Sequence, residues 1–183
     1  MSIGMKRGTV YLEEHQVEWE ENAKDTINVI KDVLGDVAID VQHVGSTSIK
    51  NIKAKPIIDI AVAVKDYEAV LEKRNQLECR DIIFRFDERP GQLLFVKGDF
   101  VADTRTHHIH VVQVDSLEWK NYLNFRDYLN SNESAAREYE KVKEKLADEF
   151  PDDRNAYLDG KGAVVSRLLD EAAKWRKIKV VGG

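Results

Sequence analysis

Apolar residues recur every three or four positions near both ends of the chain, and this spacing predicts amphipathic helices. Toward the N-terminus the repeat covers residues 13–34 and stops at a glycine, which often follows a helix. Beyond residue 115 three more repeats predict three helices. The first begins near Ser116, the second contains Tyr139, and the third runs over residues 157–175. Both ends of the chain are therefore expected to be helical.

The middle of the chain carries short or alternating apolar runs, which are typical of strands. Five such segments are residues 37–44, 57–64, 81–86, 92–97 and 106–114. A helix is expected between the second and third, over residues 67–77. This order predicts an α+β (mixed α/β) fold, with a small mixed sheet flanked by helices and a helical C-terminal part packed on it.

The length of 183 residues suits one domain, and the ten glycines and three prolines are too scattered to form a linker. We expect a single domain over residues 1–183. Residues 10–115 are expected to form the sheet-containing core, and residues 116–179 the helical part.

Charge and composition exclude several classes of function. A formal net charge of -5 makes nucleic acid an unlikely partner, because non-specific binding to it needs a broad basic surface. No apolar run is long enough to cross a membrane, and no secretory signal is evident. The single cysteine, Cys79, can form neither an intrachain disulfide nor a cysteine zinc site. We expect a cytoplasmic protein that binds a small, anionic ligand.

The segment from His43 to Ser48, His-Val-Gly-Ser-Thr-Ser, follows a predicted strand and offers a first candidate site. Gly45 lets the backbone turn sharply and approach a ligand closely, and the hydroxyl groups of Ser46 and Thr47 come next. A phosphate is the ligand that such a turn favours, although the same residues also occur in ordinary turns.

Two neighbouring predicted strands carry polar side chains among apolar ones. Asp59 lies in the run Ile-Ile-Asp-Ile-Ala-Val, where a buried carboxylate is costly unless a metal, a lysine or an arginine pairs with it. Strand alternation places His108 and His110 on one face and His107 on the other. Such a histidine pair suits a metal or two phosphate oxygens, although a polar edge strand would have the same sequence.

Basic and aromatic residues form a third group of candidates. Tyr157 and Lys161 are four positions apart on one predicted helix face, and Arg126 lies on another. These cations are suited either to bind phosphate or to cover apolar surface with their stems.

Five motifs together resemble the GrpB family over about residues 10–169: HVGSTS at 43–48, AKPIIDI at 54–60, THHIHV at 106–111, FRDYL at 125–129, and Tyr157-x-x-x-Lys161. GrpB proteins are grouped with the polymerase-β-like nucleotidyltransferase superfamily. That resemblance implies a small mixed sheet with a Gly-Ser turn and acidic metal ligands on the next strand. It also implies an Asp-x-Asp pair, but here Asp59 is flanked at the two possible partner positions by Ile57 and Ala61.

The resemblance thus implies that Asp59, His108 and His110 are catalytic and hold a divalent ion (Mg, Mn or Zn), and a soft ion suits the histidines best. The residues implied to bind the ligand and its phosphates are His43, Gly45, Ser46, Thr47, Lys55, Arg105, Arg126, Tyr157 and Lys161.

The function that the resemblance implies is nucleotide or phosphorylated-ligand binding with metal-dependent nucleotidyl or phosphoryl transfer. Two alternatives stay open: a module that binds a nucleotide or a CoA-like molecule without catalysis, and a metal-dependent hydrolase.

Overall fold

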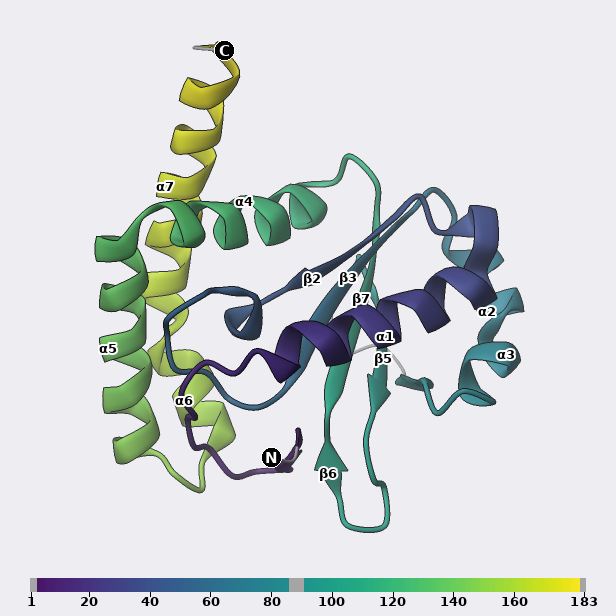
Figure 1. Ribbon diagram of the computed structural model, residues 1–183, viewed down its shortest axis with the longest axis horizontal. Helices are drawn as coiled ribbons and strands as arrows, with labels where there is room; N and C mark the ends of the chain where they lie inside the picture. Colours follow the sequence, from purple (N-terminus) through teal and green to yellow (C-terminus); the bar gives the residue numbers. More distant parts are fainter. Residues whose placement is uncertain (1–2, 86–90, 182–183) are drawn as a thin grey trace.

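A five-stranded mixed sheet forms the centre of the structure, a computed structural model that describes residues 3–85 and 91–181 (Figure 1). In spatial order its strands are β2 (Asp40–Val44), β3 (Ile58–Val64), β7 (His107–Gln113), β5 (Leu93–Lys97) and β4 (Ile83–Arg85). β3 and β7 run parallel, and every other neighbouring pair is antiparallel. All five predicted strands are confirmed; Phe86, predicted to end one of them, lies outside the described residues.

A second, two-stranded pairing joins β1 (Met5–Lys6) to β6 (Thr104–Arg105). Neither strand was predicted, because two residues are too few to show alternation. This pairing holds the N-terminal segment beside the start of β7.

Helices cover both faces of the large sheet and form a group at one end of it. The helices are α1 (Glu18–Leu34), α2 (Tyr67–Glu72), α3 (Arg74–Glu78), α4 (Leu117–Ser131), α5 (Glu133–Glu149), α6 (Arg154–Gly160) and α7 (Gly162–Val181). Figure 1 shows α5, α6 and α7 together at one end of the sheet, with α2 and α3 at the other. None of the described helices is long and apolar enough to cross a membrane.

The alternation of β3 divides the core between the two faces of the sheet. Ile58, Ile60 and Val62 pack with α1, whereas Ala61 and Ala63 pack with Trp119 of α4. Asp59 shares the α4 face with Ala61, two residues further along the same strand. The predicted mixed α+β class is therefore confirmed, and it fixes which side of the sheet carries the polar groups.

Three predicted helices differ from the observed ones. The first begins at Glu18 rather than residue 13, because Glu13 pairs with Ala54 through two backbone hydrogen bonds and is held extended. The helix predicted over residues 67–77 is split at Lys73, which ends α2 and precedes α3. The last helix is split at Lys161, which stands between two glycines, and glycine is a poor helix former.

The helical end of the structure has a core of its own, which also takes in residues from the sheet-containing part. Ile49 and Ile52 are both almost fully buried, and they pack with Tyr128, Tyr139 and Leu168. The segment between the one-turn 3-10 helix Ser46–Ser48 and β3 therefore belongs to the helical core.

Candidate functional site

Asp59 and two histidines form the polar centre of the α4 face. Asp59 is opposite His108 in the parallel β3–β7 register, and His110 lies two residues further along β7. His108 Nδ1 is 3.4 Å and His110 Nε2 is 3.5 Å from the same oxygen, Asp59 Oδ1. Burial alone would raise the pKa of Asp59, but the two histidines hold that pKa below its usual range. The partner of this carboxylate is thus a histidine pair, not a lysine or arginine.

Gly45 lies directly against Asp59. Its φ of +72° belongs to a region that side-chain-bearing residues rarely adopt, and a Cβ there would lie 2.4 Å from Asp59 Oδ2. Both the backbone conformation and the lack of space for a Cβ therefore require glycine at position 45. The turn after β2 covers the carboxylate of Asp59 on β3. The candidate residues Gly45, Asp59, His108 and His110 are brought together.

His110 carries an unsatisfied polar atom. Its Nδ1 is buried without a hydrogen-bond partner among the described residues, and its ring lies 5.2 Å from that of Tyr122 on α4. A buried unpaired group costs about 1–3 kcal/mol. Buried polar atoms without a partner are uncommon in native structures, and a catalytic role of the side chain is one explanation for them.

Asp59, His108 and His110 are the residues expected to hold a divalent ion. The two histidine ring nitrogens lie 3.4 and 3.5 Å from the same oxygen of Asp59. Across residues 3–85 and 91–181, no group of three or more histidine, cysteine, aspartate or glutamate side chains is suited to hold a metal ion. The divalent ion expected from the resemblance stays a prediction.

Three lysines from three segments lie near one another, and we call Lys55, Lys143 and Lys161 the lysine cluster. Lys55 is the member close enough to Asp59 for their charges to interact. Lys55 and Lys161 share the ring of Tyr157, with their Nζ atoms 5.1 and 5.4 Å from its centroid. Burial, followed by the charge of Lys161, lowers the pKa of Lys55 to about 8, while Asp59 acts in the opposite direction. The predicted pair of Tyr157 and Lys161 is thus joined by Lys55.

Lys143 is the member that the sequence did not single out. Only 1% of its surface is exposed, its Nζ donates a hydrogen bond to the backbone oxygen of Lys53, and it lies 4.6 Å from the ring centroid of Tyr139. The Tyr139 hydroxyl is in turn 3.2 Å from Ser46 Oγ. The signal was present, since Lys143 lies on the apolar stripe between Tyr139 and Leu146.

Burial and the charge of Lys161 lower the pKa of Lys143 to about 7, whereas Glu140 and Glu144 act to raise it. The unfolded chain keeps this proton up to a pKa of 10.5, so unfolding takes up a proton between these values. The free energy of unfolding should therefore rise with pH above about 7, by at most about 1.4 kcal/mol per unit for this group.

Urea denaturation at several pH values measures this slope. Lys143→Met should flatten it, whereas Lys145→Met, which changes an exposed lysine of the same helix, should keep it. Equal slopes in the two variants would contradict the buried state of Lys143.

Two of the other candidates have internal partners. His43 pairs with Ile60 and so lies on the α1 face, away from His108 and His110. Its Nε2 is 2.9 Å from Thr47 Oγ1, and burial lowers its pKa to about 4. Thr47 is buried. Contact of either side chain with a ligand stays a prediction.

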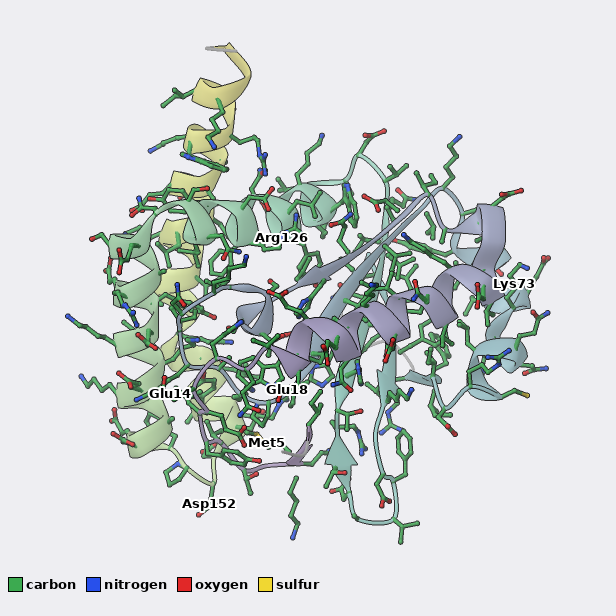
Figure 2. All side chains as sticks on the ribbon, viewed as in Figure 1. Met5, Glu14, Glu18, Lys73, Arg126 and Asp152 are labelled. Carbon is green, nitrogen blue, oxygen red and sulfur yellow. The ribbon has the colours of Figure 1, made fainter. Side chains whose placement is uncertain are left out.

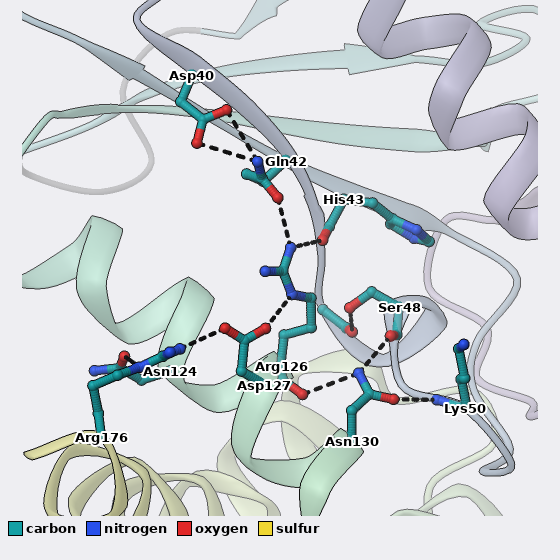
Figure 3. A network of polar contacts seen from close by, with 11 residues as sticks. Asp40, Gln42, His43, Ser48, Lys50, Asn124, Arg126, Asp127, Asn130 and Arg176 are labelled. Carbon is teal, nitrogen blue, oxygen red and sulfur yellow. Dashed lines mark hydrogen bonds and ion pairs between the residues drawn. The ribbon is translucent and has the colours of Figure 1, made fainter. Parts of the chain in front are cut away.

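Arg126 ties α4 to the sheet edge. It donates hydrogen bonds to Gln42 Oε1 and to the backbone oxygen of His43, and its Nε bonds Asp127 (Figure 3). Asp127 also pairs with Arg176 of α7. Figure 2 shows the position of Arg126 between α4 and the strands. These contacts give Arg126 a positioning role, and its contact with phosphate stays a prediction.

Arg105 lies on the β1–β6 pairing. Its guanidinium bonds the Thr104 backbone oxygen, pairs with Asp103 at 3.4 Å and covers the ring of Phe100. No contact of Arg105 with Asp59 or the lysine cluster occurs within the described part of the chain, so its contact with a ligand also stays a prediction.

Comparisons with known proteins agree on one family. The model of the GrpB protein family matches residues 9–171. The glutamate-rich protein GrpB of Alkalihalophilus pseudofirmus is 35% identical over 173 residues, which cover 92% of this chain and 99% of that protein. YqkA of Bacillus subtilis is 34% identical over 87% of this chain, which spans 46% of that longer protein.

Solved structures give the same result and add a more distant likeness. The crystal structure of GrpB from Enterococcus faecalis aligns with a TM-score of 0.84 and 32% identity, over 91% of this chain and 99% of that one. A cytoplasmic RNA terminal U-transferase aligns with a TM-score of 0.52 and 15% identity, over 74% of this chain and 42% of that one. At that identity the second likeness concerns the fold alone.

Proposed function

This chain belongs to the GrpB family and has a nucleotidyltransferase-like fold, and from that premise we propose that it binds a nucleotide or another phosphorylated ligand and transfers a nucleotidyl or phosphoryl group. One observation carries the proposal: the Gly45 turn lies against Asp59, and the lysine cluster brings positive charge to the same place. Lysines beside a carboxylate–histidine group are suited to neutralise phosphates next to a proton acceptor.

Each residue has a distinct part in this proposal. The lysine cluster binds the phosphates, and Ser46, held by Tyr139, lines the turn. Asp59 pairs with His108 and His110, and this group takes the proton of the attacking hydroxyl. As the new P–O bond forms, the bond to the leaving phosphate breaks, and the lysine cluster neutralises the charge of that leaving group. No step of the proposal uses a metal ion.

A second candidate is a module that binds the same ligands without turnover. It is favoured by the residues around Asp59, because Ile57 and Ala61 provide no second carboxylate and histidines occupy the adjacent strand.

Binding tests the proposal first. We expect calorimetric titration of the wild-type chain to detect at least one ligand among nucleoside triphosphates and CoA derivatives, each tested with EDTA and with Mg²⁺, Mn²⁺ or Zn²⁺. UTP comes first, because one solved neighbour is named for UTP selectivity. Binding must also raise the melting temperature. A panel without any binding would overturn both candidates, and turnover of a bound ligand would decide between them.

A further inference from the structure

The lysine cluster contains more positive charge than its surroundings compensate. No carboxylate of the described residues lies within ion-pair distance of Lys55, Lys143 or Lys161. The two acidic neighbours of Lys143 already have other partners. Glu140 accepts hydrogen bonds from the Arg137 side chain and from the backbone N–H of Lys53, and Glu144 forms an ion pair with the Lys53 side chain. Lys55 and Lys161 thus face the ring of Tyr157, whereas Lys143 faces the ring of Tyr139 and the Lys53 backbone oxygen.

The arrangement costs stability unless something compensates for it. Lys143 is almost fully buried and its charge is opposed by the charges of Lys161 and Lys55. Like charges held together in a partly buried place repel strongly. A polyanion beside Lys55 and Lys161, which are only partly buried, would relieve that repulsion and also offset the charge of Lys143 without touching it.

We propose that the lysine cluster is a binding site for the phosphate chain of a di- or triphosphate, and that it binds this chain without a divalent metal. This inference rests on the proposed function and states how that site holds its ligand. A phosphate chain without Mg²⁺ keeps two more negative charges than its Mg²⁺ complex, and this strengthens its attraction to the lysines. Asp59 has no second carboxylate beside it on β3, and its oxygen is already approached by two histidines, so the lysines supply the counter-charge.

Calorimetric titration with inorganic tripolyphosphate tests this site, in EDTA and in excess Mg²⁺. We expect binding in EDTA that Mg²⁺ does not strengthen. Lys161→Met should weaken it about tenfold or more, since a hydrogen bond to a charged group contributes about 1.5–3 kcal/mol. Lys143→Met should weaken it less, because that buried side chain acts through its charge alone. Lys145→Met, on the exposed side of α5, should bind like the wild-type chain. Lys161 is only partly buried, so its variant tests the site even where Lys143→Met folds poorly.

Three results would overturn the inference: binding that requires Mg²⁺, equal losses in Lys145→Met and Lys161→Met, or no binding of tripolyphosphate. If nucleotides bind while tripolyphosphate does not, the lysine site fails and the proposed function stands. If tripolyphosphate binds in EDTA while no nucleotide or CoA derivative does, the lysine site stands and the nucleotide proposal fails.

Discussion

Asp59→Asn should lower turnover by about two to four orders of magnitude and change the free energy of unfolding by less than about 1.5 kcal/mol. Asn keeps the shape of the side chain but cannot take up a proton. The effect on stability is small because the partners of Asp59 are His108 and His110. If Asp59 were instead paired with a buried lysine or arginine, its replacement would leave that cation unpaired and lower the free energy of unfolding by about 3–5 kcal/mol.

The same variant should bind tripolyphosphate in EDTA at least as tightly as the wild-type chain, because a negative charge near Lys55 is removed. Turnover, tripolyphosphate affinity and the free energy of unfolding can be measured on one preparation by kinetics, calorimetry and urea denaturation. A loss of about 3–5 kcal/mol with unchanged turnover would give Asp59 a structural role only.

The effect of Asp59→Asn on stability should also depend on pH. The histidines lower the pKa of Asp59 in the folded state, so its contribution to stability is present above the unfolded pKa of about 3.9 and is lost as pH falls. The difference between wild type and Asp59→Asn should therefore shrink in acid. A difference that grows in acid would contradict the direction of this pKa shift.

Gly45→Ala should be the most destabilising addition of one carbon atom at the site, with a loss of about 2–6 kcal/mol in the free energy of unfolding. The strained backbone accounts for about 1–3 kcal/mol, and contact of the new Cβ with Asp59 adds a similar amount. The contact also displaces Asp59 from His108 and His110. Ligand binding and turnover should therefore both fall in the fraction that remains folded.

Gly35→Ala is the matched control for this prediction. Gly35 also has a positive φ, +55°, but a Cβ there meets nothing within 4 Å. In urea denaturation, the free energy of unfolding of Gly35→Ala should fall only by the part that the strained backbone accounts for. Equal losses in the two variants would mean that the contact between Gly45 and Asp59 contributes nothing.

The sheet was predictable from sequence because its alternation is strong. His108 and His110 were placed on one face by strand alternation, and the parallel β3–β7 register brings Asp59 beside them. The five predicted strands needed no tertiary information. Their order in the sheet did, since β5 and β4 lie beyond β7 although they precede it in the chain.

The predictions failed where tertiary contacts override local pattern. Lys143 lies on an apolar stripe, but its burial follows only from the packing of α5 against the Lys53 backbone. His43 was expected among the ligand-binding residues, but its side chain lies on the face of the sheet that packs against α1. The start of α1 was misplaced because the Glu13–Ala54 pairing joins residues far apart in the sequence.

The placement of Ile49 and Ile52 among the helices has a consequence for folding kinetics. These residues belong to a loop between two strands, yet their apolar contacts come from residues 128–172, some 80 to 120 positions later. Contacts of such long sequence separation form slowly. Chain segments cut near residue 115 should therefore not refold separately, because Ile49 and Ile52 would be left without these contacts.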